Sequence, residues 1–157
     1  MKIGIACPYS WDVPGGVQFH IRDLAEELIS RGHTVSVIAP ATEGTELPDF
    51  VVPTGAAIPI PYNGSVARLA FGPRVNWQVR KWLQTNQFDV LHVHEPFVPS
   101  LAMLALMSAE CPVVSTSHTA MDRSKFLSIA SPLLVPVLEK TRARIVEAAL
   151  QALRDEG

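Results

Sequence analysis

Two adjacent glycines, Gly15 and Gly16, separate the first apolar segment of the chain from its first helical pattern. The apolar segment, KIGIAC, predicts a buried strand, and the spacing of apolar residues from Val17 onward predicts a helix. A helix N-terminus directs free backbone N–H groups and the positive end of the helix dipole at one point, which suits a phosphate or another anion. Glycine lacks a Cβ, so a ligand can approach this backbone closely. The pattern is not the GxGxxG of dinucleotide-binding proteins, and a plain turn explains it about equally well.

A second polar segment, PYNGSVAR, occupies residues 61–68. Arg68 offers a fixed positive charge that suits phosphate. Tyr62, Asn63 and Ser65 offer hydroxyl and amide groups that pair with sugar or polyol oxygens. We therefore predict a loop that binds an anionic, polyhydroxylated ligand. A polar surface loop with an unengaged arginine is an equally good explanation.

Histidines stand at the ends of two predicted strands. His92 and His94 form an HxH pair, and the alternation of a strand places both on one face. A metal site there would need further ligands, which the sequence does not supply nearby, so we predict no metal. His118 follows the next strand, where a ligand contact and a simple hydrogen-bonded histidine are equally consistent with its position. Glu95 suits either a general base or the cap of the following helix.

The elements that must hold these residues alternate between strand and helix. Strands are predicted at residues 2–7, 34–39, 89–94 and 112–117, with short edge strands at 50–52 and 57–60. Helices are predicted at residues 17–31, 73–85, 99–109 and 128–141. This alternation predicts a doubly wound, mostly parallel α/β domain with helices on both faces. Because such sheets bind ligands beyond the carboxyl ends of their strands, Gly16, Arg68 and His118 should share one rim.

The predicted helix at residues 73–85 carries a mixed basic and aromatic face. Arg74, Trp77 and Lys81 lie on this face, opposite an apolar stripe. A tryptophan among basic residues suits weak, reversible contact with an anionic membrane surface. A solvated face with a covered tryptophan is the more common explanation.

Composition restricts the class of protein. The chain has 157 residues, which suits one well-packed domain. A hydrophobic fraction of 48% is typical of a globular protein, and the net charge of -2 argues against a general nucleic-acid binder. We expect a cytoplasmic protein, because no apolar run reaches membrane-spanning length and no signal peptide is present. Cys7 and Cys111 are predicted to be free thiols.

Four segments carry a family resemblance: CPYSWDVPGGVQFHI, VPTGAAIPIPYNGSVARLAFGP, FDVLHVHEPFVPSLAMLAL and PVVSTSHT. They resemble the N-terminal domain of bacterial phosphatidylinositol α-mannosyltransferases, which are retaining glycosyltransferases of the GT-B type with two Rossmann-like domains. The resemblance covers about residues 1–119 and weakens afterwards. It implies transfer of mannose from GDP-mannose to phosphatidylinositol by a peripheral protein on the cytoplasmic face of the membrane. It implies no cofactor and no metal, since GDP-mannose is a substrate.

The resemblance also implies roles for individual residues. Gly15 and Gly16 would face the phosphate and sugar of the donor, and His118 would contact the mannose near the reacting carbon. Residues that line the acceptor side would be Tyr9, Gln18, Tyr62, Asn63, Ser65, Arg68 and Thr119. Residues that contact anionic lipid would be Arg74, Trp77 and Lys81.

Members of that family are more than twice as long as this chain, and their second domain holds most of the nucleotide-sugar contacts. We therefore expect residues 1–146 to form an acceptor-binding domain and residues 147–157 to add a short helical segment, with the donor-binding domain absent. We expect no measurable transfer by the 157-residue chain alone. Three alternatives stay open: a non-catalytic module for a phosphorylated polyol or sugar, a glycosyltransferase with another acceptor, and a half that works with a separate second domain.

Overall fold

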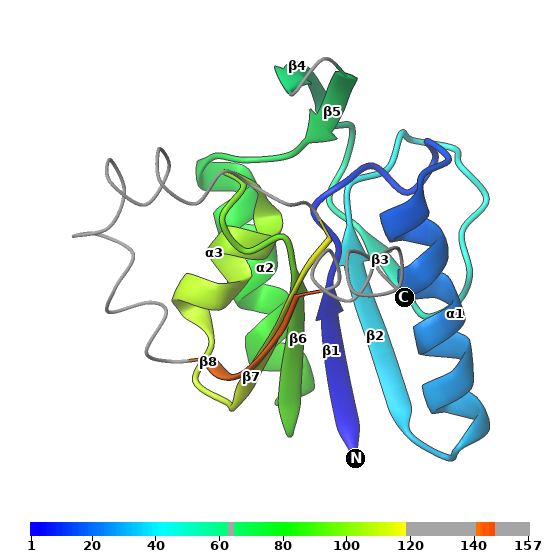
Figure 1. The fold of residues 1–157 in the computed structure, drawn as a ribbon, viewed down its shortest axis with the longest axis vertical. Helices are drawn as coiled ribbons and strands as arrows, with labels where there is room; N and C mark the ends of the chain where they lie inside the picture. Colours follow the sequence, from blue (N-terminus) through cyan, green and yellow to red (C-terminus); the bar gives the residue numbers. More distant parts are fainter. Residues whose placement is uncertain (63–64, 119–140, 147–157) are drawn as a thin grey trace, which may run out of the picture.

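A computed structural model of the chain describes residues 1–62, 65–118 and 141–146. Six strands form one parallel sheet in the order β3-β2-β1-β6-β7-β8 (Figure 1). These strands are β1 (Lys2–Ala6), β2 (Thr34–Ala39), β3 (Val51–Pro53), β6 (Val90–His94), β7 (Val113–Ser117) and β8 (Thr141–Val146). The predicted doubly wound α/β class is confirmed.

In the described ranges, three helices cover the two faces of this sheet. Helix α1 (Gly16–Ser30) packs on one face, and helices α2 (Pro73–Asn86) and α3 (Leu101–Ser108) pack on the other (Figure 1). The side chains of β1 alternate between two cores: Ile5 packs with Ile21 of α1, and Ala6 packs with Trp82 of α2. The boundaries predicted for the helices at residues 17–31, 73–85 and 99–109 agree with the structure to within a few residues.

The helices on the second face are fixed by a buried tryptophan and a serine cap. The indole nitrogen of Trp82 donates to Ser36 Oγ at 2.8 Å, so the buried N–H has an acceptor on the strand β2 that it packs against. Ser100 caps α3, because its hydroxyl oxygen accepts from the backbone N–H of Ala102 at 3.2 Å. The alternative that Glu95 caps this helix was therefore wrong.

The described residues of the predicted loop, 61–62 and 65–68, are strand residues instead. They belong to an antiparallel pair, β4 (Ile58–Tyr62) and β5 (Ser65–Leu69), which makes a second, two-stranded sheet. This hairpin lies beyond the carboxyl ends of the parallel strands (Figure 1). The sequence carries its signal, because Asn-Gly is the dipeptide most favoured in two-residue hairpin turns, and here it follows Tyr62. The strand predicted at residues 57–60 exists, but in this hairpin and not at the edge of the main sheet.

The sequence also failed to predict β8, which pairs in parallel with β7. The predicted helix at residues 128–141 lies outside the described residues except for Thr141, which begins β8. The helical segment predicted at residues 147–157 lies outside them entirely, and so do Asn63 and Thr119.

Two further findings concern the described residues. None of their helices combines the length and the apolar character that crossing a bilayer requires. Cys7 and Cys111 are free thiols, as predicted, and complete burial of Cys7 raises its thiol pKa to about 12.

Candidate functional site

The site lies where the connections of the sheet change direction. Strand β1 stands between β2 and β6, so the chain leaves β1 toward one half of the sheet and later returns to build the other half. Ligands of doubly wound sheets bind at this switch point, beyond the carboxyl ends of the strands. The glycine loop follows β1, Glu95 follows β6 and His118 follows β7, so three segments meet at this rim.

The loop between β1 and α1, which we call the glycine loop (residues 7–16), is fixed by side chains. Gln18 donates from Nε2 to the carbonyl oxygens of Ser10 and Val13, both at 3.0 Å. Asp12 accepts from Ser10 Oγ at 2.6 Å and from Thr42 Oγ1 at 2.7 Å. Burial alone would raise the pKa of Asp12, but these hydrogen bonds outweigh it and the pKa is lowered. Asp12 is therefore ionised and connects the loop to Thr42 through hydrogen bonds, a role that the sequence analysis missed.

The two glycines differ in what surrounds them. A Cβ on Gly15 would lie 2.5 Å from Oε1 of Gln18, whose amide is already held by two hydrogen bonds. A Cβ on Gly16 would meet nothing within 4 Å. Packing therefore demands glycine at position 15, whereas position 16 leaves open space in front of the helix. No side-chain cap is present at the N-cap residue Gly15, and within the described part of the chain the first N–H groups of α1 point out of the helix toward that space.

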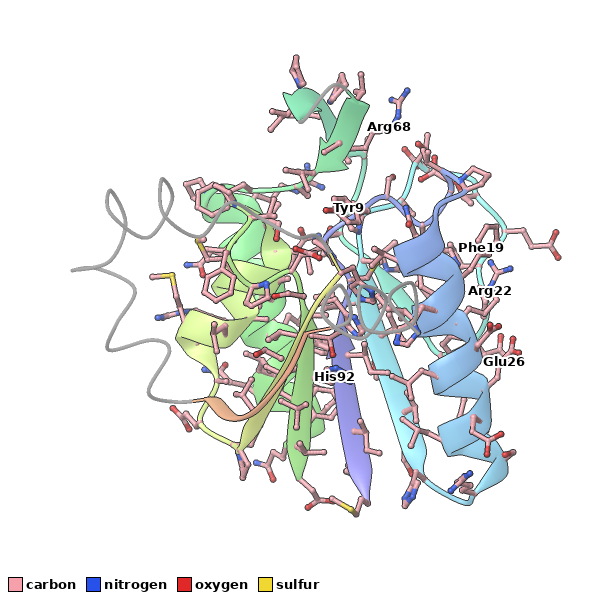
Figure 2. All side chains as sticks on the ribbon, in the orientation of Figure 1. Tyr9, Phe19, Arg22, Glu26, Arg68 and His92 are labelled. Atoms are coloured by element: carbon pink, nitrogen blue, oxygen red, sulfur yellow. The ribbon has the colours of Figure 1, made fainter. Side chains whose placement is uncertain are left out.

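Two backbone contacts join the hairpin to the glycine loop. The N–H of Ser10 donates to the carbonyl oxygen of Arg68 at 3.1 Å, and Tyr9 forms an antiparallel bridge with Leu69. The side chain of Tyr9 packs against Leu69 and Val98. Figure 2 shows Arg68 on the hairpin, above the end of the sheet where Tyr9 lies. The sequence-based expectation that Arg68 and the glycine pair share one rim is confirmed.

The guanidinium of Arg68 is exposed and makes no hydrogen bond or ion pair with the described part of the chain. Its charge is therefore available to a ligand. Of its predicted companions, Tyr62 and Ser65 are register partners in the pairing of β4 with β5. Asn63 is outside the described residues.

Four histidines gather under the rim. A hydrogen bond of 2.7 Å joins His94 Nδ1 to His118 Nε2, and one of 2.8 Å joins His92 Nε2 to Thr116 Oγ1. The ring of His20, from α1, has its centroid 5.7 Å from that of His94 and 5.1 Å from that of His118. The predicted placement of His92 and His94 on one face is confirmed by a ring distance of 4.3 Å. His20 was not singled out from the sequence.

Burial controls the charge of this cluster. Burial and the neighbouring rings of His20 and His118 lower the pKa of His92 to about 4. Burial and the same kind of neighbours hold the pKa of His94 well below its ordinary value. Both rings are therefore neutral at physiological pH, and each then has one nitrogen that donates and one that accepts.

Among the described residues, the structure brings two further histidines to His94 but adds no common ligand group for the HxH pair as a whole, because His92 is not part of that group. Ligand nitrogens of His20, His94 and His118 lie within 4.8 Å of one another, and three such groups could hold a metal ion. Two of these residues already use a nitrogen in the hydrogen bond between His94 and His118. That the function needs no metal stays a prediction.

Glu95 fixes the main chain beside the histidines. It is 1% exposed, and its carboxylate accepts a hydrogen bond from the backbone N–H of His118. Its φ of 48° lies in the left-handed region, which few residues other than glycine adopt. Glu95 therefore holds the point at which the chain leaves β7 and presents His118 to the rim.

Exposed apolar and basic side chains lie on the hairpin and α2. Trp77 is 61% exposed, so the alternative of a covered tryptophan was wrong. The Lys81 ammonium lies 5.0 Å from the centroid of the Trp77 ring, and Arg74 is exposed on the same helix. Exposed apolar side chains before α2 and on the hairpin are Ile58, Ile60, Val66 and Phe71.

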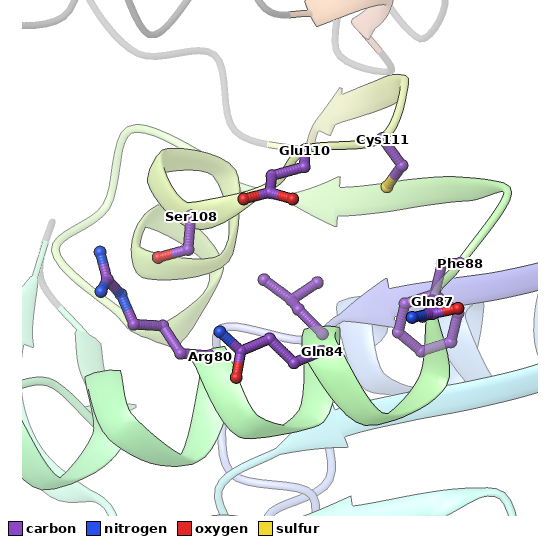
Figure 3. A pocket seen from close by; sticks show the side chains of 8 residues that line it. Arg80, Gln84, Gln87, Phe88, Ser108, Glu110 and Cys111 are labelled. Atoms are coloured by element: carbon purple, nitrogen blue, oxygen red, sulfur yellow. The ribbon is translucent and has the colours of Figure 1, made fainter.

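A cavity of about 510 Å³ lies at the opposite end of the sheet, between the last turns of α2 and α3 (Figure 3). Phe88 and Cys111, which line it, precede β6 and β7. The cavity is therefore at the amino ends of the strands, and no predicted site residue lines it. Its place in the fold separates it from the rim where parallel sheets bind ligands.

The sheet order and its switch point define a Rossmann-like α/β domain. Sucrose-phosphate synthase from Thermosynechococcus elongatus has the same fold in the matched part, with a TM-score of 0.53 at 14% sequence identity. The match covers 85% of this chain and 40% of that one.

Sequence comparison gives the family. A phosphatidyl-myo-inositol mannosyltransferase of Mycolicibacterium smegmatis is 55% identical over 150 residues, which cover 96% of this chain and 39% of the relative. One of Propionibacterium freudenreichii is 40% identical over 152 residues, with coverages of 92% and 40%. The sequence profile of Glycosyltransferase Family 4 matches residues 14–154. The chain belongs to Glycosyltransferase Family 4, and it spans about 40% of the length of these curated relatives.

Proposed function

We propose that this chain is the acceptor-binding part of a retaining glycosyltransferase that transfers mannose from GDP-mannose to phosphatidylinositol. The observation that carries the proposal is the joining of the hairpin to the glycine loop through Ser10 and Tyr9. It brings the exposed guanidinium of Arg68 and the uncapped N-terminus of α1 to one rim. Two anionic groups, the head-group phosphate and the donor diphosphate, would then have separate positive partners at that rim.

The reaction would be driven by positioning and by charge stabilisation. The bond between the mannose C1 and the diphosphate oxygen breaks as the inositol hydroxyl forms its bond to C1 from the same face. The hydroxyl proton passes to the departing phosphate oxygen, so no protein base is required. N–H groups at Gly15 and Gly16 would stabilise the leaving diphosphate, and His118 would contact the oxocarbenium-like sugar. This scheme needs no metal and no cofactor.

Titration calorimetry on the 157-residue chain tests the acceptor assignment. We expect inositol 1-phosphate to bind and uncharged inositol to bind far more weakly, because the phosphate is the group that Arg68 recognises. GDP and GDP-mannose should give little heat. Binding of nucleotide without inositol 1-phosphate would mean that the acceptor site is assigned to the wrong substrate.

Catalysis is tested separately in a chimera of residues 1–146 with the remaining C-terminal part of the Mycolicibacterium smegmatis relative. Transfer of mannose to phosphatidylinositol by this chimera would support the enzyme. Inositol phosphate binding by the chain, with a folded but inactive chimera, would favour the alternative of a non-catalytic phospho-polyol module.

We also propose that the protein is peripheral on the anionic, cytoplasmic face of the membrane. Trp77 and its cationic neighbour Lys81 combine apolar area with positive charge, and Arg74 adds a second charge. The exposed apolar residues of the hairpin extend this surface toward the acceptor site. A lipid acceptor held at Arg68 could then remain partly in the bilayer.

Vesicle sedimentation measures this contact. Trp77→Ala should weaken binding to vesicles of phosphatidylinositol and phosphatidylcholine by about tenfold, because a large exposed aromatic side chain no longer enters the interface. Ile29→Ala, which removes an exposed apolar side chain from the last turn of α1, serves as the matched control and should have no effect. Equal binding to vesicles of pure phosphatidylcholine would rule out the electrostatic part.

A further inference from the structure

The ring of His118 is held by a neighbour that cannot itself reach solvent. His94 has 0% exposed surface, and its ring stacks on that of His118 with an interplanar angle of 16°. Its Nδ1 lies 2.7 Å from His118 Nε2. Its other nitrogen, Nε2, is buried and has no hydrogen-bond partner among the described residues. Within that part of the chain, the one hydrogen bond of the His94 ring is therefore the bond to His118.

Only two proton arrangements of the neutral His94 ring satisfy the contact. In the first, Nδ1–H of His94 donates to an unprotonated Nε2 of His118. In the second, Nε2–H of His118 donates to His94, whose own proton must then sit on the buried, unpartnered Nε2. Buried N–H groups without an acceptor are rarer in proteins than acceptors that lack a donor. The first arrangement is therefore the more stable one.

We infer that His94 is a positioning residue that fixes the tautomer of His118, with the proton of His118 on Nδ1. The carboxylate of Glu95 holds the backbone N–H of the same residue, so main chain and ring are both oriented from the end of β6. With Nε2 occupied by His94, His118 has no lone pair to serve as a base. The proton of its ring is then on Nδ1, and this N–H can act only as a donor.

The part of this inference that concerns the substrate rests on the proposed function, because it specifies how His118 would contact the sugar. The residue would donate a hydrogen bond to a mannose or phosphate oxygen, which agrees with a reaction that needs no protein base. The tautomer itself does not depend on any substrate, so it can be measured whether or not the chain binds inositol phosphate.

Two-bond ¹H–¹⁵N correlation spectra of the histidine-labelled 157-residue chain report which ring nitrogens carry protons. We expect a protonated Nδ1 and an unprotonated Nε2 for both His94 and His118. In His94→Leu, which removes the donor but keeps the volume, His118 should shift toward the Nε2–H form that imidazole prefers in water. In His94→Asn, whose amide nitrogen can replace Nδ1–H as a donor, the Nδ1–H form of His118 should return.

Three results would overturn the inference. One is an Nε2–H signal for His118 in the unmodified chain, which is decisive even if the Leu variant fails to fold. Another is an unchanged His118 spectrum in a Leu variant whose backbone amide spectrum remains that of the folded chain. The third is a histidine spectrum that changes when a chelator is added, because it would mean that His20, His94 and His118 hold a metal ion and not a hydrogen bond.

Discussion

Replacing His118 by alanine in the chimera should lower kcat by about 10²- to 10³-fold, the usual cost of removing one donor that faces developing charge. KM for phosphatidylinositol should change little, because Arg68 and not His118 is the proposed partner of the head group. We expect the large fall in kcat because His118 is oriented before the substrate binds. His94 holds its ring, and the Glu95 carboxylate holds its backbone N–H. Steady-state transfer of mannose from labelled GDP-mannose measures both constants.

His33→Ala is the matched control for this experiment. His33 is a half-buried histidine whose Nδ1 lies 3.3 Å from the N-terminal amine of Met1. It precedes β2 and so lies at the amino ends of the strands, opposite to the rim. Its replacement should leave kcat unchanged. A His118→Ala variant that raised KM while keeping kcat would mean that the residue contributes to binding substrate and transition state alike.

Arg68→Ala should reduce kcat/KM for phosphatidylinositol by about 10- to 150-fold, which corresponds to the loss of one hydrogen-bonded charge contact of about 1.5–3 kcal/mol. The fold should survive, because the contact that joins Arg68 to Ser10 uses the backbone carbonyl and not the side chain. Arg68→Lys should recover only part of the loss, since an ammonium cannot match the two-pronged guanidinium contact to a phosphate.

Arg31→Ala tests whether any exposed arginine would give the same result. Arg31 is an exposed residue after the end of α1, paired with Glu27 at 2.7 Å. A surface pair of this kind contributes little to stability, so its loss should leave both fold and turnover intact. If Arg31→Ala and Arg68→Ala reduced kcat/KM equally, overall charge and not a specific head-group contact would explain the effect.

Local patterns in the sequence were sufficient to predict the sheet and its helices. The alternation of TVSVIA predicted β2, and the apolar stripe from Val17 onward predicted α1. Once these elements were placed in parallel order, the rule for carboxyl ends brought Gly16, Arg68 and His118 to one rim. Each step used residues that are close together in the chain, where periodicity carries information.

The parts that were missed depend on contacts between distant segments. His20 stands among the apolar residues of α1, and that polar interruption of the stripe was a signal that could have been used. Its approach to His94 and His118, however, follows from how α1 packs on the sheet. Asp12 braces the glycine loop through Thr42, a contact that no local pattern reveals. The hairpin was missed for another reason, because the Asn-Gly signal was present and overlooked.

The hairpin of β4 and β5 is a sheet of its own, attached to the glycine loop through Ser10 and Tyr9. Two strands alone are only marginally stable, and the parallel pairs of β1 with β2 and with β6 include no residue of the hairpin. Evolution can therefore vary this segment while the rest of the domain stays constant. Replacing residues 58–69 by a hairpin with different side chains offers a direct way to redirect the proposed transferase to another acceptor.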